Sequence, residues 1–355
     1  LGWNPLAGEY PATALSTFGG DLVAGGDFLC MGKAWAEGVA RWDGVEWSSF
    51  GAGLQLRRLL ANSAWPEVKV LHEFGGQLVA GGSFTNPRHL ARWDGTAWSL
   101  FGPTPEPAVS LSSTSTELVA SAYPSSVMKW NGSAWDVLPV PIGASVNCVR
   151  WQNDNLYAAG VFQFGGTWAS RVVRWDGTAW QPVGSGFTTI STITSAGVYT
   201  LGEFNGELIA GGRFTAADGN PAANVARWNG AAWVALGEGI VGPTDSIVYA
   251  LESYHGSLVA GGGIASASSP MTPFVRRWDG IQWNPLGNLP LVPQSPGSTL
   301  DAVHSLTVSH GELVVAGDFA FASGNTARGF ARWTDSGIPW IAVQPKPLTV
   351  SIATM

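Results

Sequence analysis

A tryptophan-centred phrase recurs along the chain, and this recurrence limits the fold more than any other feature. The clearest copies read VARWDGVEWSSFG from Val39, LARWDGTAWSLFG from Leu90, VVRWDGTAWQPVG from Val172, NVARWNGAAWVALG from Asn224 and VRRWDGIQWNPLG from Val275. Two altered copies begin at Val127 and Phe330. The first tryptophans of successive copies lie between 37 and 55 residues apart. Units of this length are typical of repeat proteins, in which each unit buries its apolar surface against its neighbours.

Each phrase belongs to a longer unit that divides into four short strands, A to D. In the second unit strand A is Val68–Phe74 and strand B is residues 77–84, while strand C ends in Arg-Trp and strand D begins at the second Trp. Short apolar runs separated by Gly, Asn and Asp are typical of strands joined by tight turns. The Asp-Gly or Asn-Gly between strands C and D supplies the positive-φ residue of a hairpin. Apolar residues alternate or run continuously and never follow a helical period, so we expect no helices.

Seven such units predict an all-β fold, a seven-bladed β-propeller of four-stranded antiparallel blades. We place the propeller in residues 1–343, and residues 344–355 form a proline-containing tail that is the candidate start of a further domain. The predicted repeats are near residues 12–51, 68–102, 108–139, 146–184, 198–237, 247–287 and 302–343.

The ring also needs a strand that closes its last blade. The first residues, LGWNPLAG, are nearly a copy of IQWNPLG from Ile281, so residues 1–8 resemble a strand D with no A, B or C before it. Trp340 starts a second candidate strand D, after a two-residue insertion in the last repeat. We expect Trp3 to complete the seventh blade, which leaves the Trp340 strand displaced or added as a fifth.

The repeated phrase is interpreted as packing between and within blades, and not as seven binding sites. A ligand would not need evenly dispersed copies that are each held in a hairpin. The Gly-Gly pair of strand B is expected to let the strand bend or a neighbouring large ring approach its backbone. The residues assigned to this structural repeat are Arg41, Trp42, Trp47, Trp93, Trp98, Trp175, Trp180, Trp228, Trp233, Trp278 and Trp283.

The order of these features resembles the kelch repeat. A Gly-Gly pair ends the second strand, an aromatic residue and Asp end the third, and a Trp starts the fourth. The resemblance is greatest to secreted bacterial proteins that repeat AGGxF…ARWDGxxWxxLG, and it covers residues 12–343. It implies a secreted or cell-surface propeller, while kelch-like propellers differ widely in what they bind. Trp stands where kelch proteins usually have Tyr, and the sequence has no Tyr-Cys-His copper arrangement of the galactose oxidase type.

Charge and composition narrow the range of partners. The net charge of −7 and the pI near 5.2 disfavour nucleic acid and anionic membrane surfaces. No apolar run approaches the roughly 18 residues of a spanning helix, so we expect no direct membrane insertion. Cys30 and Cys148 fall in different repeats and in no metal-spacing motif, so we expect neither a disulfide nor a metal site. The chain lacks an initial Met and a signal-like segment, so we expect it to be part of a larger chain or assembly.

Loop lengths indicate which face of the ring binds a ligand. The A–B and C–D turns are short, whereas the B–C and D–A loops are long, and an up-and-down blade places both long loops on one face. Binding residues concentrate on long loops held by a rigid scaffold, and exposed aromatic rings with polar neighbours suit sugar or protein ligands. The alternative is that each Trp packs beneath its own loop. The candidate ligand-binding residues are Trp35, Trp65, Arg57, Arg58 and Trp168.

An enzymatic site would need a constellation of acids. Asp27 and Asp318 follow the glycines of strand B in the first and last blades, which the ring brings together. Glu67, Asp245 and Asp301 lie near the starts of strands A, at the mouth of the channel. A glycosidase needs two carboxyl groups about 5 to 9.5 Å apart. The alternative is that these acids are solvated or ion-paired, and the five histidines show no metal spacing.

We therefore expect a non-catalytic extracellular module that binds a glycan or a protein through its long-loop face and needs no cofactor. Two alternatives stay open. One is a carbohydrate-active enzyme, a glycosidase or lyase, with acids at the channel mouth. The other is a structural segment of a surface layer or filament, which would show a defined self-contact.

Overall fold

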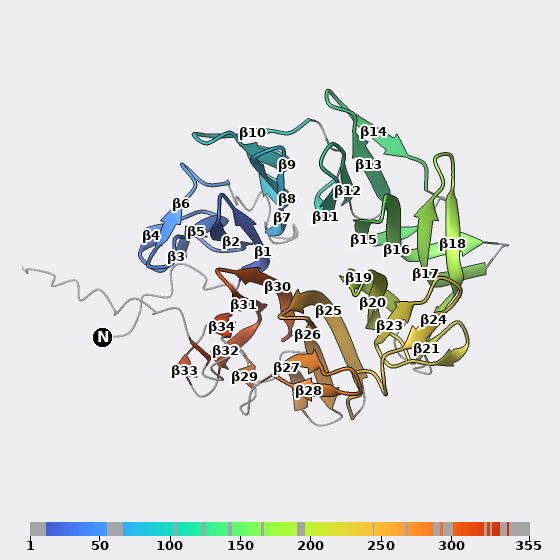
Figure 1. Cartoon of the computed structure of the whole chain (residues 1–355). Helices are drawn as coiled ribbons and strands as arrows, with labels where there is room; N and C mark the ends of the chain where they lie inside the picture. Colours follow the sequence, from blue (N-terminus) through green and yellow to red (C-terminus); the bar gives the residue numbers. More distant parts are fainter. Residues whose placement is uncertain are drawn as a thin grey trace, which may run out of the picture.

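The chain builds a ring of β-sheets with no helix among the residues that the structure describes. These residues of the computed structural model are 12–54, 67–102, 104, 106–122, 125–140, 144–164, 167–189, 196–243, 245–266, 269–286, 292–293, 301–322, 325–326, 329–333 and 339–340. In this part of the chain we find no helix with the length and apolarity to cross a bilayer. Seven sheets follow one another in chain order around a central axis (Figure 1), which confirms the predicted seven-bladed, all-β propeller with antiparallel blades.

The first strand of every blade lies next to the axis and the last lies at the rim (Figure 1). Blade 1 comprises β1 (Ala12–Phe18), β2 (Asp21–Gly26), β5 (Val39–Trp42) and β6 (Trp47–Ser49). Blade 2 comprises β7 (Val68–Phe74), β8 (Gln77–Thr85), β9 (Arg88–Trp93) and β10 (Trp98–Leu100). Blade 3 comprises β11 (Ala108–Ser113), β12 (Leu118–Ala122), β13 (Ser126–Trp130) and β14 (Trp135–Leu138). Blade 4 comprises β15 (Ser145–Gln152), β16 (Asn155–Phe164), β17 (Thr167–Trp175) and β18 (Trp180–Thr188).

The remaining blades keep the same order, and some loops add short strands. Blade 5 comprises β19 (Gly197–Phe204), β20 (Glu207–Arg213), β23 (Val225–Trp228) and β24 (Trp233–Ala235). Blade 6 comprises β25 (Asp245–Tyr254), β26 (Ser257–Ser266), β27 (Ser269–Trp278) and β28 (Trp283–Pro285). Blade 7 comprises β30 (Val303–Ser309), β31 (Glu312–Gly317), β34 (Phe330–Trp333) and β35 (Pro339–Trp340). The short strands are β3 (Cys30–Met31), β4 (Ala34–Trp35), β21 (Ala216–Ala217), β22 (Asn220–Pro221), β29 (Val292–Pro293), β32 (Phe319–Ala322) and β33 (Asn325–Thr326).

Paired tryptophans hold the C–D hairpins together. In six blades the two tryptophans of the phrase lie opposite each other, with ring centroids 5.2 to 5.6 Å apart. Tilted aromatic pairs of this kind contribute about 0.5–1.5 kcal/mol beyond the area they bury. The pairs are Trp42–Trp47, Trp93–Trp98, Trp130–Trp135, Trp175–Trp180, Trp228–Trp233 and Trp278–Trp283.

In four of these pairs the second tryptophan also bonds to the preceding blade. Its indole N–H donates to a backbone carbonyl near the end of that blade's phrase. These bonds join Trp98 to Phe50 (3.2 Å), Trp135 to Phe101 (2.7 Å), Trp233 to Val183 (2.8 Å) and Trp283 to Leu236 (3.2 Å). The residue after each acceptor is glycine because the next blade's rings lie against it. At Gly102 a Cβ would lie 2.8 Å from the Trp135 ring, and the backbone φ is +73°.

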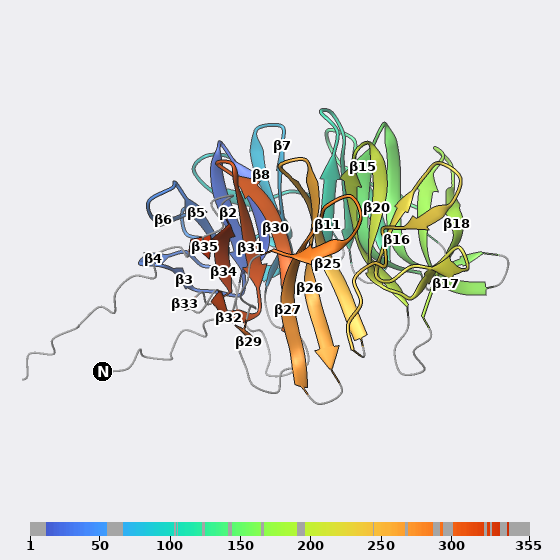
Figure 2. The same cartoon turned by 60° about the horizontal axis from the view of Figure 1, so that its bottom comes forward.

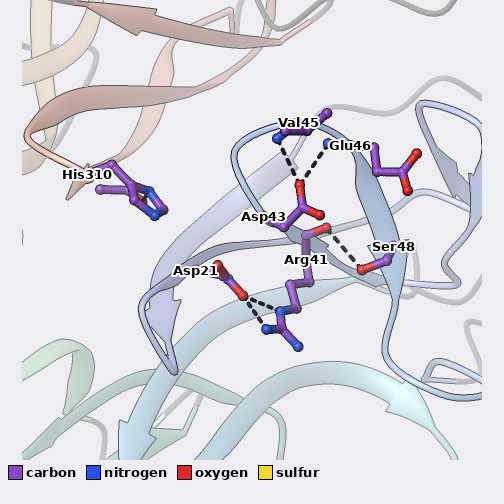
Figure 3. Close-up of polar contacts among 8 residues, drawn as sticks. Asp21, Arg41, Asp43, Val45, Glu46, Ser48 and His310 are labelled. Atoms are coloured by element: carbon purple, nitrogen blue, oxygen red, sulfur yellow. Dashed lines mark hydrogen bonds and ion pairs between the residues drawn. The ribbon is translucent and has the colours of Figure 1, made fainter.

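The Asp and Arg of the phrase have local structural roles, which Figure 3 shows for blade 1. The Asp43 carboxylate accepts hydrogen bonds from the backbone N–H groups of Val45 and Glu46, so it closes the C–D turn. These two bonds lower the pKa of Asp43. The Arg41 guanidinium pairs with Asp21 at the start of strand B. Equivalent pairs are Lys129–Glu117, Arg227–Glu207 and Arg332–Glu312.

The first glycine of each Gly-Gly pair lets the next blade pack closely. A Cβ at Gly25 would lie 2.7 Å from Val68 Cγ1, and one at Gly211 would lie 2.7 Å from Val248 Cγ1. The close approach expected from sequence is therefore present. In the neighbouring strand A its partner is a valine at Gly25, Gly211 and Gly261 and an alanine at Gly81, however, and not a large ring.

The last blade closes the ring with its own C-terminal strand. β35 pairs with β34 through Trp333–Pro339 and Arg332–Trp340, so the expectation that Trp3 supplies the fourth strand is wrong. The two-residue insertion lies between the paired strands and leaves their pairing intact. Residues 1–8 lie outside the described residues, as do residues 344–355, for which a further domain stays a prediction.

Packing of blade 7 on blade 1 completes the ring. The Leu15 backbone N–H donates to Ser305 Oγ at 3.1 Å. The rings of Trp47 and Phe330 meet edge to face at 5.2 Å. The Arg332 guanidinium lies 5.7 Å from the Trp42 ring centroid, within cation–π range.

Replacing Trp233 by Phe tests the bond between blades. Trp233 is buried and donates to Val183 O, whereas the indole N–H of the buried Trp180 has no partner among the described residues. Trp180→Phe removes a similar ring volume and is therefore the matched control. We expect Trp233→Phe to lower the free energy of unfolding by about 1 kcal/mol more than Trp180→Phe in denaturant titrations. Equal losses would show that the indole–carbonyl bond contributes nothing.

Candidate functional site at the channel mouth

A β-bulge near the start of every strand A places one unpaired residue beside the central axis. The A–B pairing skips one position in each blade, and a bulged residue is unpaired and re-aimed. The second glycine of strand B allows this arrangement, because a Cβ at Gly212 would overlap the carbonyl oxygen of Gly197 in its own strand A. The bulged residues are Thr13, Lys69, Val109, Asn147, Tyr199, Tyr249 and His304.

Three consecutive bulged residues form an aromatic row. The ring centroids of Tyr199 and Tyr249 are 5.5 Å apart, and those of Tyr249 and His304 are 5.4 Å apart, with planes inclined by 47° and 46°. All three side chains are partly exposed. In two other blades the bulged residue instead bonds to the next blade. Thr13 Oγ1 donates to Val68 O, and Asn147 Nδ2 donates to Val198 O.

Two polar contacts that involve carboxylates accompany the row. His304 Nε2 lies 2.6 Å from Asp318 Oδ2, and the Asp318 backbone N–H donates to Ala302 O. Arg213, at the end of β20, lies 3.1 Å from Asp245 Oδ2 at the start of β25 in the next blade. We name these residues the channel-mouth cluster: Tyr199, Arg213, Asp245, Tyr249, His304 and Asp318.

The environment of Tyr249 keeps its phenol protonated. Burial is the largest cause that raises the pKa of Tyr249, and the adjacent Tyr199 raises it further. Arg213 lowers this pKa and Asp245 raises it. The hydroxyl is therefore both a donor and an acceptor at neutral pH.

The cluster lies at the end of the channel that carries the long loops. Strands A begin and strands B end at this face, and the cluster residues lie at those ends. The β3–β4 hairpin and strands β29, β32 and β33 lie on one side of the ring (Figure 2). Trp35 is in this hairpin, and its side chain is 64% exposed.

The other predicted ligand-binding residues are not placed by the structure. Arg57, Arg58 and Trp65 lie outside the described residues. Trp168 is in β17, where its backbone pairs with Gln163, and its side chain is not described. The contribution of these residues to binding stays a prediction.

Three of the predicted acids lie beside a basic side chain. Asp318 and Asp245 belong to the channel-mouth cluster, and Glu67 lies 3.6 Å from Lys69 Nζ. Asp301 is buried, and Asp27 is partly buried after β2. Among the described residues no group of three or more His, Cys, Asp or Glu side chains could hold a metal ion.

Sequence reasoning missed most of the cluster. The sequence did not predict a role for Tyr199, Tyr249 or Arg213, and it was used to assess His304 only as a metal ligand. The available signal is positional: when the repeats are aligned on the valine near the start of strand A, the next residue is Tyr, Tyr and His in blades 5 to 7. No motif marks these residues, because each comes from a different repeat.

Open hollows lie on the opposite face, which carries the short turns, and two of them adjoin blade 5. One, of about 310 Å³, lies between strands A of blades 4 to 6 and is lined in part by Arg150, Glu203 and Glu252. Arg150 Nη2 lies 3.6 Å from Glu203, and burial raises the pKa of Glu252. The other hollow, of about 610 Å³, lies between blades 5 and 6 beside the Arg227–Glu207 pair. Their walls include short turns that every blade shares, so we place the candidate site at the channel mouth.

Comparisons with known proteins identify the fold and no family. No family model matches the chain, and no curated protein sequence matches it. Among solved structures the chain is similar to the WD40 β-propeller domain of Doa1, with 12% identity, a TM-score of 0.55 and coverage of 91% of this chain and 92% of that one. It is also similar to YCF48 bound to D1 peptide, with 14% identity, a TM-score of 0.50 and coverage of 96% and 98%. At these identities the similarity shows the propeller fold alone.

Glu252→Gln tests the electrostatics of the smaller hollow. Burial raises the folded-state pKa of Glu252 above its ordinary value of 4.5, so its stabilising effect is complete below that pH and is lost as the pH rises through the folded pKa. Because Gln does not ionise, we expect Glu252→Gln to unfold at higher denaturant concentration at pH 7. This increase in the unfolding denaturant concentration should disappear towards pH 4, where Glu252 is protonated and therefore uncharged like Gln.

The control is Glu203→Gln, which replaces the more exposed neighbouring carboxylate that pairs with Arg150. This variant should show no gain at pH 7. If Glu252→Gln raised the unfolding denaturant concentration by the same amount at every pH, burial of the ionised carboxylate would not be the cause.

Proposed function

We propose that this chain is a binding module that holds a segment of another polypeptide over the channel mouth. The observation that carries the proposal is the aromatic row Tyr199–Tyr249–His304, together with the Arg213–Asp245 ion pair and the His304–Asp318 contact beside it. Blades 5 to 7 supply it from their innermost strands, so the groups are held on rigid elements.

The chemistry of the row suits a polypeptide. Partly exposed tyrosines offer apolar area and a hydroxyl group together, and they are enriched where proteins bind one another. The Arg213–Asp245 and His304–Asp318 pairs supply hydrogen-bond donors and acceptors for main-chain groups of a ligand. YCF48, whose solved structure has a similar fold, is described as bound to D1 peptide, and this supports the same class of ligand here.

Trp35 is the proposed outer anchor of the ligand, since it presents an exposed ring on the same face. Arg57, Arg58, Trp65 and Trp168 are proposed to contribute from the surrounding loops. A kelch-type repeat, secretion to the cell surface and an extracellular partner are further proposals, which rest on the sequence resemblance.

Selection of peptides from a random displayed library, followed by affinity measurements, tests the proposal. We expect Tyr249→Ala and Trp35→Ala each to lower the affinity for a selected peptide at least tenfold, since truncation of a hot-spot aromatic costs about 2 kcal/mol or more of binding free energy. Ile281→Ala is the control, because Ile281 is 81% exposed in a C–D turn on the opposite face.

Each variant should first be shown to melt like the parent chain. Loss of binding in Ile281→Ala alone, or selected peptides that bind all variants equally, would contradict a site at the channel mouth.

The His304–Asp318 pair favours one second candidate, a carbohydrate-active enzyme. A carboxylate that bonds to an imidazole can orient it for proton transfer, and Tyr249 lies beside it. Incubation with a panel of polysaccharides should then release new reducing ends or unsaturated products, and Asp318→Asn should abolish the release. Glycan binding without turnover would instead assign a glycan ligand to the module.

A further inference from the structure

A hollow in blade 4 opens on the face that carries the short turns, opposite to the channel-mouth cluster. Its volume is about 460 Å³, within the range of about 300–1,000 Å³ that is typical of small-ligand sites. Residues of the A–B turn and of the C–D hairpin of blade 4 line it. They include Trp151, Asp154, Asn155, Arg174, Trp175 and Asp176.

The first of these residues, Trp151, is large where the other blades have a small or acidic residue. Trp151 is in β15, where it pairs with Leu156 at the start of strand B. The fold needs no indole at this position, since six blades form without one. The residues that pair with the equivalent leucine are Thr17, Glu73, Ser113, Glu203, Ser253 and Val308.

Asp154 takes the place of a glycine in the A–B turn. Its φ is +58°, and five other blades have glycine at this position with φ between 71° and 90°. A residue other than glycine adopts this left-handed conformation at a cost in free energy, although Asp and Asn tolerate it better than most. Blade 4 therefore keeps a carboxylate beside the hollow where glycine suits the backbone better. The equivalent glycines are Gly20, Gly76, Gly206, Gly256 and Gly311.

Asn155 takes the place of an acid. In blades 1, 3, 5 and 7 an Asp or Glu at the start of strand B pairs with the Arg or Lys that precedes the first Trp of the phrase. In blade 4 these two positions hold Asn155 and Arg174. The amide is neutral, so it does not compensate the charge of Arg174, whose side chain is exposed.

These changes occur in a blade that keeps its phrase unaltered. The phrase reads VVRWDGTAWQPVG, and Trp175 pairs with Trp180 as in the other blades. Three departures from the repeat therefore line one hollow without any loss of the C–D hairpin. This clustering indicates a role for the hollow itself, because the ring is built from blades that lack all three changes.

Hydrogen bonds fix this A–B turn to the blades on both sides. The Trp151 backbone N–H donates to Ser112 Oγ of blade 3 at 2.8 Å. The side-chain amides of Gln152 and Asn153 donate to Gly206 O of blade 5 at 3.0 and 3.3 Å. The turn is held in place before a ligand binds, which limits the entropy that binding costs.

The side chains around the hollow suit a sugar. Trp151 and Trp175 are partly exposed, and a flat indole ring offers apolar area to the C–H face of a pyranose. Asp154 supplies acceptors for hydroxyl groups, Arg174 supplies donors, and the amide of Asn155 supplies both.

The charges around the hollow favour a neutral sugar over an acidic one. Asp176 accepts hydrogen bonds from the backbone N–H groups of Ala179 and Thr178, which lower its pKa and keep its carboxylate charged. Two carboxylates, Asp154 and Asp176, thus stand against the single guanidinium of Arg174.

We propose that this hollow binds one pyranose unit of a neutral glycan. The Trp151 ring packs on the sugar, and Asp154, Asn155 and Arg174 bond to its hydroxyl groups. The polypeptide site proposed above lies on the opposite face of the ring, so the two ligands do not compete.

Binding of the full chain to immobilised hexamers of glucose, xylose, mannose and N-acetylglucosamine tests the proposal, with a galacturonic acid hexamer as the acidic counterpart. Calorimetry then gives the affinity for each neutral hexamer that binds. The decisive variant is Asp154→Gly, which restores the residue of the other blades and should melt at or above the temperature of the parent chain. We expect Asp154→Gly to lower the affinity at least tenfold.

Two further variants also restore residue types of other blades. Trp151→Ser restores the serine of blades 3 and 6, and Asn155→Glu restores the acid that pairs with the equivalent of Arg174. Each should lower the affinity at least fivefold. If Trp151→Ser melts lower than the parent chain, Asp154→Gly decides the matter.

The controls are Ile281→Ala, in a C–D turn on the same face, and Tyr249→Ala at the channel mouth. Both should leave glycan affinity unchanged, and Asp154→Gly should leave peptide affinity unchanged. The proposal is overturned if no neutral hexamer binds, if only the acidic hexamer binds, or if Asp154→Gly binds like the parent chain. Loss of glycan binding in Tyr249→Ala alone would assign the glycan to the channel mouth and overturn it too.

Discussion

The hydrogen bond from a tryptophan indole of one blade to a backbone carbonyl of the preceding blade is the contact on which the ring depends. It forms at Trp98, Trp135, Trp233 and Trp283, and it joins the rim strands of neighbouring sheets. The same ring packs on its cross-strand partner, so one residue stabilises its hairpin and the interface between blades. The phrase therefore recurs with the blades, because it stabilises the hairpin of its own blade and, at these four interfaces, the contact with the preceding blade, as expected for a protein in which each repeat contacts only its neighbours.

The divergent third blade shows how the parts of the phrase depend on one another. Where the bond forms, the acceptor is followed by glycine, which lets the next blade's ring approach the backbone. After Trp135 the phrase reads DVLP, without glycine, and the indole N–H of Trp180 in the next blade has no partner among the described residues. Loss of the glycine and loss of the bond thus occur at the same interface.

Sequence alone could predict the ring because its determinants are local and repeated. The Trp pairs, the turn carboxylates such as Asp43 and the glycine pairs all lie within one phrase or one strand. Closure was predicted wrongly because residues 1–8 and the strand at Trp340 match the same pattern, and only pairing with β34 decides between them. The channel-mouth cluster was largely missed for a related reason. Tyr199, Tyr249 and His304 meet only after the ring closes, and each occupies a bulged position whose residue type differs from blade to blade.

Hydrogen exchange with a bound peptide would test most directly whether the repeats build the scaffold while the channel mouth binds. Backbone amides would be compared by mass spectrometry in the free and bound states. The account predicts slower exchange at the starts of β19, β25 and β30 on binding, with no change in the C–D hairpins that carry the tryptophans. Protection spread over the C–D hairpins of several blades, with none at those three strand starts, would contradict it and make the repeated phrase itself the binding element.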